Sequence, residues 1–322
     1  MDRDGREAGR PSASQPRRQP SRPRIARRLD FPKAGCYDRL HQAASALDDR
    51  RLPLRERILR IGIVGLGTIG RAVARAVAEG LPGCTLAGAV SRDEARAKAF
   101  LATLPGTPSY LSLPRLVEES DLVVEAATQA ALVEIARVVL EAGRDLLVLS
   151  VGGLLDHPEW PDLAAKHGCR IHAPSAAIAG LDGLKGAAVA GHLDSVVMET
   201  RKPPRGLAGA PGAAGLDLDG LRGETLVFEG TAREAVRAFP ANVNVVAAVS
   251  LAGLGPDATR IRVYAVPGLA RNRHAVTAVG AFGRLSIEIE NVPSENPRTG
   301  KLSYLSTIAY LRDLGAPLRV GT

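Results

Sequence analysis

Three glycines with the spacing G-x-G-x-x-G stand between a short apolar run and an Ala-rich helical segment; they are Gly65, Gly67 and Gly70. In a strand–turn–helix unit, the first glycine permits a tight turn. The second lets the backbone approach a pyrophosphate, and the third lets the helix pack closely on the strand. Backbone N–H groups at the helix start, here at Thr68 and Ile69, would hold the phosphates. The motif in this context predicts a Rossmann dinucleotide-binding unit; the alternative is a glycine turn in another α/β protein.

The end of the second predicted strand bears on which nucleotide binds. An acidic residue at this place hydrogen-bonds the ribose 2′-hydroxyl of NAD, whereas an arginine nearby accommodates the 2′-phosphate of NADP. This chain has Ser91 followed by Arg92. The pair favours NADP, or tolerance of it, and leaves the choice between NAD and NADP open. In the alternative interpretation, Arg92 is exposed to solvent and Asp93 only caps the next helix.

One of six histidines stands where chemistry is expected. His274 opens a predicted strand directly after the polar turn Arg271-Asn272-Arg273. A side chain that titrates near neutrality can accept and donate protons during catalysis. Most histidines in proteins are structural or solvated, so spacing alone leaves the role of His274 open.

Alternating strands and helices would position these residues. The alternation of apolar strands and helical patterns predicts a parallel, doubly wound sheet with helices on both faces. The predicted strands are 60–64, 84–90, 121–125, 145–150 and 169–173, and the predicted helices are 69–80, 93–103, 113–118, 129–142 and 159–167.

The pattern changes after Pro174. A helix at 176–189 leads into strands whose last pair forms a hairpin through Phe282-Gly283, with apolar and polar residues alternating in the second arm. The fold class is therefore α/β: a Rossmann-type doubly wound parallel sheet plus a second α+β domain with a mixed, mostly antiparallel sheet. The further predicted strands are 193–201, 225–230, 259–265, 274–281 and 284–291, and the further helices are 231–237, 241–253 and 302–314.

Three segments are expected along the chain. Residues 1–57 form a disordered basic extension, 58–173 the dinucleotide-binding domain, and 174–295 a catalytic and dimerisation domain. Residues 296–322 pack back on the dinucleotide-binding domain. Of the net charge of +8, residues 1–28 supply +6, with nine Arg against three acids, so the remainder is close to neutral. We therefore expect no nucleic-acid partner, although an Arg-rich segment can also bind nucleic acid or a membrane.

Composition limits the cofactors and the compartment. The three cysteines are widely spaced and show neither metal-ligand nor disulfide spacing, so no metal site is expected and a reducing, cytoplasmic location is favoured. No apolar run approaches the roughly 18 residues that a membrane span requires, and no membrane partner is expected.

Several motifs in the second half occur in an order and with spacings that resemble the L-aspartate dehydrogenase family. The resemblance extends over about residues 59–315. The motifs are Pro174-Ser175-Ala176-Ala177-Ile178-Ala179-Gly180-Leu181-Asp182, Thr200-Arg201-Lys202-Pro203-Pro204, Phe239-Pro240-Ala241-Asn242-Val243-Asn244-Val245, Arg271-Asn272-Arg273-His274 and Ile289-Glu290-Asn291-Val292-Pro293-Ser294-Glu295-Asn296-Pro297.

The resemblance implies a reaction and roles for residues. Enzymes of this family oxidise L-aspartate to iminoaspartate with NAD or NADP, or run in reverse from oxaloacetate and ammonia, and the imine can supply NAD biosynthesis. His274 matches the active-site histidine, and Ala177 and Asn244 match positions that contact the nicotinamide. Candidates for holding substrate include Lys202, Asn242 and Arg273, with Arg201 and Arg271 as further nearby cations. A homodimer is expected.

Two places depart from the family pattern, and one of them is the Ser91-Arg92 pair, where NAD-preferring members often have Asp. Where the family usually has Ser-Gly-Ala, this chain has Ser175-Ala176-Ala177, which adds a methyl group beside the expected nicotinamide site. A related amino-acid dehydrogenase or an imine reductase remains an alternative on the same fold. A third hypothesis, a nucleotide-sensing protein that reaches nucleic acid through its Arg-rich tail, is disfavoured by the position of His274 and the near-neutral body.

Overall fold

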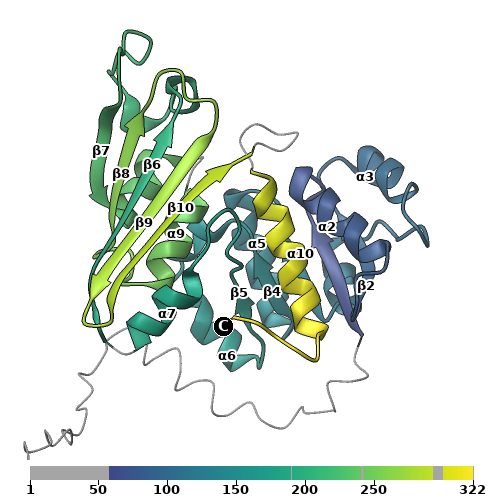
Figure 1. Cartoon of the computed structure of the whole chain (residues 1–322). Helices are drawn as coiled ribbons and strands as arrows, with labels where there is room; N and C mark the ends of the chain where they lie inside the picture. Colours follow the sequence, from purple (N-terminus) through teal and green to yellow (C-terminus); the bar gives the residue numbers. More distant parts are fainter. Residues whose placement is uncertain (1–57, 190, 241–242, 293–299, 322) are drawn as a thin grey trace, which may run out of the picture. The chain divides into compact units, whose positions relative to one another are not determined.

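The computed structural model describes residues 58–189, 191–240, 243–292 and 300–321. The predicted extension 1–57 lies outside the described residues. The described residues form two five-stranded sheets and the helices that accompany them (Figure 1). The extents predicted above for the three segments stay predictions.

The first sheet is entirely parallel, with the strand order β2-β1-β3-β4-β5. Its strands are β1 (Leu59–Val64), β2 (Cys84–Val90), β3 (Leu122–Glu125), β4 (Asp145–Val148) and β5 (Ile171–His172). An isolated parallel bridge joins Ala89 of β2 to Tyr110. The strand order reverses between β1 and β3, and ligands of such sheets bind beyond the carboxyl ends of the strands at this switch point.

Helices cover both faces of the first sheet, as the sequence predicts. The apolar residues of the sheet and of these helices form two buried clusters. In one, Ile61 and Ile63 of β1 pack with Val73 of α2, and in the other, Val123 of β3 packs with Leu132 of α5. Near-continuous apolar strands are typical of a sheet that is buried on both sides. The helices are α2 (Thr68–Ala78), α3 (Glu94–Leu101), α4 (Leu113–Glu119), α5 (Gln129–Glu141) and α6 (Trp160–Lys166), and a 3-10 turn η2 (Val151–Leu155) follows β4.

The second sheet is mixed, with the order β10-β9-β6-β8-β7. Only β6 and β8 pair in parallel; the other three pairings are antiparallel. This agrees with the predicted mostly antiparallel sheet and with the predicted hairpin, which joins β9 to β10. The strands are β6 (Leu193–Lys202), β7 (Thr225–Thr231), β8 (Arg260–Ala265), β9 (Asn272–Gly280) and β10 (Gly283–Asn291).

Helices α7 (Leu181–Val189), α8 (Ala232–Ala238) and α9 (Val243–Ala252) accompany the second sheet, with short turns η3 (Pro204–Gly206) and η4 (Pro211–Ala213). The last helix, α10 (Lys301–Gly315), lies beside α2 (Figure 1). Its Leu311 is fully buried in the cluster around β1.

The predicted helix 176–189 is wrong over its first five residues, because α7 begins only at Leu181. Ala176 has φ +51° and Gly180 has φ +72°, both in the left-handed region, so a continuous helix is impossible there. The predicted strands 145–150 and 169–173 are also shorter in the structure.

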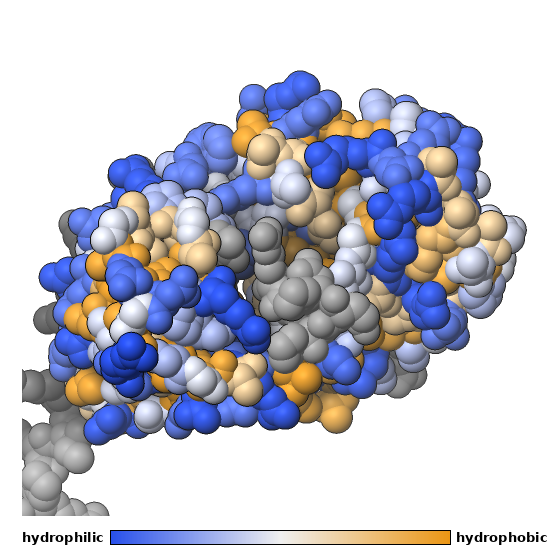
Figure 2. Space-filling view, turned by 90° about the horizontal axis from the view of Figure 1, so that it is seen from above, coloured by the Kyte–Doolittle hydropathy of each residue, from blue (hydrophilic) through white to orange (hydrophobic). Residues whose placement is uncertain are grey.

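Hydrophilic and apolar residues are interspersed over the face seen in Figure 2. Among the helices of the described residues, none combines the length and the apolar character needed to span a membrane.

Candidate functional site

The glycine loop between β1 and α2 has the geometry of a phosphate cradle. Gly65 has φ +97°, and a Cβ at Gly65 or Gly70 would collide with backbone atoms of Ala126 or of Gly65 itself. At Gly67, by contrast, nothing lies within 4 Å of an added Cβ. The protein backbone therefore leaves no room for a side chain at Gly65 or Gly70. Beside Gly67, which precedes the first residue of α2, Thr68, there is room for a ligand. These residues fit a dinucleotide, whose pyrophosphate would accept hydrogen bonds from this helix start.

A cleft of about 800 Å³ adjoins this loop, and its lining includes Gly67, Thr68, Ser91 and Arg92. The structure thus brings the two predicted parts of the nucleotide site together. The hydroxyl of Ser91 lies 3.5 Å from the N–H of Leu66, and the side chain of Arg92 is exposed. A volume of this size is in the range of small-molecule sites.

A carboxylate that the sequence interpretation assigned no role lies at the end of β3. Glu125 is fully buried and accepts hydrogen bonds from the N–H groups of Ala127, Leu149 and Ser150 and from the Ser150 hydroxyl, at 2.8–3.2 Å. Burial raises the pKa of Glu125. By these bonds Glu125 ties the segments that follow β3 and β4 to each other at the switch point. Its signal in the sequence is an acid that ends an otherwise apolar strand.

Hydrogen bonds also fix the two residues predicted to contact the nicotinamide. The side-chain oxygen of Asn244, at the start of α9, accepts from the N–H of Gly152 at 3.1 Å. The carbonyl of Ala177 accepts from the side-chain amide of Asn291 at 3.1 Å, and the neighbouring carbonyl of Ala176 accepts from the Ser306 hydroxyl at 2.9 Å. The segments after β4 and β5 are thereby bonded to the start of α9, the end of β10 and the first half of α10.

His274 lies in β9 directly opposite Thr200 of β6, and Lys202 follows two residues after Thr200. The period of two in a strand places these three side chains on the same face of the sheet. His274 is buried, and its Nδ1 lies 3.1 Å from the Thr200 hydroxyl. Burial, and then the charge of Lys202, lower the pKa of His274 to about 3, so the imidazole is neutral near pH 7.

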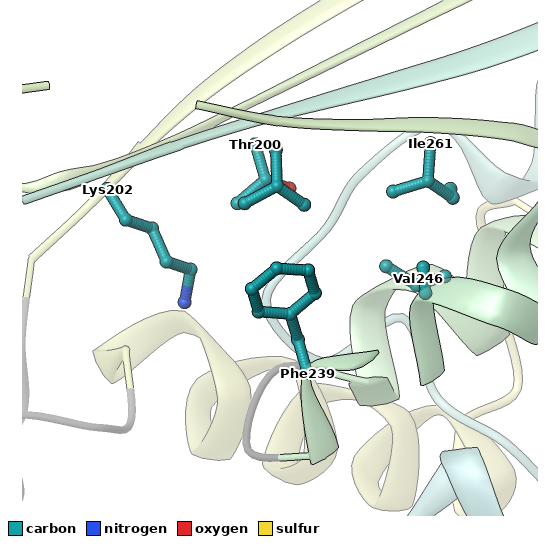
Figure 3. A pocket seen from close by; sticks show the side chains of 7 residues that line it. Thr200, Lys202, Phe239, Val246 and Ile261 are labelled. Atoms are coloured by element: carbon teal, nitrogen blue, oxygen red, sulfur yellow. The ribbon is translucent and has the colours of Figure 1, made fainter. Parts of the chain in front are cut away.

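Lys202 is 6% exposed, and burial lowers its pKa to about 8. Burial disfavours its ammonium form, and a carboxylate brought close to it would favour that form. Beside it, Thr200, Phe239, Val246 and Ile261 contribute to the lining of a small cavity of about 10 Å³ (Figure 3). Since this cavity holds about one water molecule, it is not itself the substrate site.

The other cationic side chains that were expected to bind the substrate point away from His274. Arg273 precedes His274 in β9 and therefore faces the opposite side of the sheet, where it pairs with Glu290 at 2.9 Å. Arg271 pairs with the same carboxylate at 3.1 Å, and Arg201 pairs with Glu199 at 2.9 Å. Asn242 lies outside the described residues. The structure thus brings Lys202, and not Arg273, to the predicted catalytic histidine.

Within residues 58–189, 191–240, 243–292 and 300–321, no group of three or more His, Cys, Asp or Glu side chains is arranged to hold a metal ion.

Two family models match the chain. Residues 65–174 match the homoserine dehydrogenase NAD-binding domain, and residues 182–314 match the aspartate dehydrogenase C-terminal domain. The glycine cradle on the first sheet and the buried histidine on the second thus belong to a dehydrogenase that uses NAD or NADP.

Similar proteins identify the family. L-aspartate dehydrogenase 3 from Bordetella bronchiseptica is 45% identical over 82% of this chain and 98% of its own length. L-aspartate dehydrogenase from Methanosarcina barkeri is 43% identical over 82% of this chain and all of its own length. The crystal structure of aspartate dehydrogenase from Thermotoga maritima superposes with a TM-score of 0.62 at 26% identity, covering 82% of this chain and 99% of that one. The chain belongs to the L-aspartate dehydrogenase family.

Proposed function

We propose that this protein is an NAD(P)-dependent L-aspartate dehydrogenase that oxidises L-aspartate to iminoaspartate, with His274 as the catalytic base. The observation that carries the proposal is the pairing of a buried, neutral imidazole with the buried cation Lys202 on one sheet face. The family membership supports aspartate as the substrate, because the relatives are L-aspartate dehydrogenases.

The oxidation removes a hydride from Cα and a proton from the amine. A bound nicotinamide would supply the acceptor for that hydride. His274 accepts the proton, for which a neutral imidazole is required. The two carboxylates of aspartate raise the pKa of His274 when they enter, because nearby negative charge favours the imidazolium. The base is thus weak in the free protein and strengthens when substrate is present.

Lys202 binds a substrate carboxylate in this proposal. The three arginines that compete for this role pair with glutamates on the other face of the sheet. A charge-assisted hydrogen bond to a carboxylate offsets the cost of keeping an ammonium group buried. Ala177 and Asn244 border the nicotinamide, and their hydrogen bonds to Asn291 and Gly152 hold them in place.

The imine leaves by one of two routes. In the first, His274 releases the amine proton to solvent and then takes a proton from the attacking water, and hydrolysis gives oxaloacetate and ammonia. In the second, the intact imine supplies NAD biosynthesis. The same residues serve the reverse reaction from oxaloacetate and ammonia.

Absorbance of the reduced nicotinamide tests the proposal directly. Purified protein with L-aspartate and either NAD or NADP is expected to produce it, whereas L-glutamate and L-alanine are expected to give at most a small fraction of that rate. No aspartate-dependent signal with either cofactor, at neutral or alkaline pH, would refute the proposed activity. Faster turnover of another amino acid would favour the related amino-acid dehydrogenase.

We further propose a cytoplasmic homodimer without nucleic-acid or membrane partners. The near-neutral charge of the chain beyond residue 28 supports the absence of a nucleic-acid partner. Light scattering coupled to size-exclusion chromatography tests the dimer, since a monomeric mass at micromolar concentration would contradict it.

A further inference from the structure

The cleft beside the glycine loop carries an unusual concentration of positive charge. Four arginines contribute to its lining, and Asp93 is the one acidic residue among the lining residues. Arg71 and Arg75 come from α2, Arg92 follows β2, and Arg96 comes from α3.

Asp93 is already engaged at the start of α3. Its carboxylate accepts from the N–H of Arg96 at 3.0 Å as the helix N-cap, and it lies 3.8 Å from the Arg96 guanidinium. The acid that would bind the 2′-hydroxyl of NAD belongs at the end of β2. There the chain has Ser91, whose hydroxyl faces the N–H of Leu66 in the glycine loop.

Two of the arginines are held in place by their surroundings. Arg71 donates from Nε to the Leu66 carbonyl at 2.9 Å, and its guanidinium lies over the Phe100 ring, 5.1 Å from the ring centroid. Arg75, one turn further along α2, lies 5.9 Å from the same centroid. Stacking on an aromatic face orients a guanidinium while leaving its edge available to hydrogen-bond an anion.

Arg92 has a different environment. Its side chain is exposed and forms no hydrogen bond or ion pair with another described residue. It follows the residue at which NAD-binding and NADP-binding sites differ. A phosphomonoester adds about 1.5–2 negative charges at pH 7, and guanidinium groups match its oxygens in pairs.

We infer that this cleft binds the 2′-phosphate of NADP through Arg92, within the positive field of the other three arginines, so that the protein prefers NADP to NAD. The inference rests on the proposed dinucleotide site but not on the substrate. Arg71, which is bonded to the glycine loop, serves both cofactors, whereas Arg92 serves only the phosphorylated one.

Nucleotide binding without aspartate provides the test. Calorimetric or fluorescence titrations compare NADPH with NADH, and 2′,5′-ADP with ADP, on the full chain. The wild type is expected to bind each 2′-phosphorylated ligand at least about tenfold more tightly. Arg92→Ala is expected to weaken binding of NADPH and 2′,5′-ADP by about 10–100-fold, the usual range for a hydrogen bond to a charged group, and to change NADH and ADP by less than about twofold.

Lys98→Ala is the matched control, because Lys98 is an exposed cation of the same helix as Arg96 but does not line the cleft. It should leave the preference unchanged. Ser91→Asp supplies the missing acid and is expected to reverse the preference toward NADH. Equal binding of NADH and NADPH by the wild type, or an equal loss for both in Arg92→Ala, would overturn the inference. A preference for NADPH without aspartate turnover would keep it and refute only the proposed reaction.

Discussion

His274 and Lys202 are both ionisable side chains that the fold buries on one sheet face, and burial acts on them in the same direction. It lowers both pKa values, because it disfavours the charged form of each. At neutral pH the histidine is therefore an available base, while the lysine, with a pKa of about 8, is still mostly charged. In the proposed reaction the two groups thus separate proton transfer from carboxylate binding.

Replacing His274 tests its role in proton transfer. His274→Asn is expected to lower kcat by about 10²–10⁴-fold, the usual contribution of a positioned general base. Binding of reduced nucleotide should change by less than about twofold, since His274 lies outside the nucleotide cleft. His167→Asn, at a half-buried histidine directly after α6, is the control and should retain full turnover. Full turnover by His274→Asn would remove the catalytic assignment.

The lowered pKa of Lys202 predicts that the binding of a dicarboxylate depends on pH. Because burial depresses its pKa to about 8, the charged form is present below pH 8 and is lost as the pH rises through that value. Affinity for succinate, a dicarboxylate without an amine that titrates, should therefore fall above pH 8. Lys202→Met is expected to weaken succinate binding about 10–100-fold at pH 7 and to abolish this pH dependence.

Competitive inhibition against aspartate measures the succinate affinity. Lys166→Met changes an exposed lysine at the end of α6 and should preserve both the affinity and its pH dependence. An unchanged fall above pH 8 in Lys202→Met would assign the titration to another group.

Some residues of the candidate site could be predicted from the sequence, and others could not. The glycine loop was predictable because its geometry is local: one turn requires the glycine spacing whatever surrounds it. Arg273 was placed in a turn because the predicted strand began at residue 274. In the structure β9 begins at Asn272, so Arg273 lies within the strand and faces away from His274. The role of Glu125 depends on donors about 25 residues away, which no local pattern reveals.

At the scale of elements, the departure from the family pattern at Ala176 affects the backbone of the segment before α7. The sequence suggested that the extra methyl group matters through the nicotinamide. The structure adds a backbone reason for glycine here, since Ala176 has φ +51°. The left-handed region costs a residue with a Cβ about 1–2 kcal/mol. The Ala-rich composition favoured a helix over 176–189, but bonds from Asn291 and Ser306 to the carbonyls of this segment override that propensity.

Glycine at position 176 should consequently stabilise the protein. Ala176→Gly removes the left-handed strain but adds chain entropy in the unfolded state, so the free energy of unfolding should rise by a net of about 0.5–1 kcal/mol. Ala179→Gly, in the same segment but without a positive φ, should lower it. Urea denaturation of both variants measures the difference. A loss of stability in Ala176→Gly would show that the methyl group contributes more through packing than the backbone conformation costs.

At the scale of the whole molecule, the family models cover residues 65–174 and 182–314, which hold most of the described helices and strands. The two relatives compared above are covered over 98% and 100% of their own length while matching 82% of this chain, and β1 begins at Leu59. The parallel first sheet and the mostly antiparallel second sheet could be predicted from the alternation of strands with helices and from hydrophobic periodicity. The order of the strands within each sheet could not. The pairing of β6 with β8 in parallel was not predictable in this way, because β7 lies between the two strands along the chain and itself pairs antiparallel with β8.

Removing residues 1–57 tests whether the first segment takes part in function. Both sheets, the nucleotide cleft and His274 lie beyond it, so the shortened chain is expected to keep kcat and nucleotide affinity within about twofold. Because residues 1–28 carry a net charge of +6, the deletion should remove any salt-sensitive binding of the full chain to a random duplex DNA. Parallel assays of turnover and DNA retention at low and high salt separate these effects. A large loss of turnover after deletion would show that the basic segment contributes to the enzyme itself.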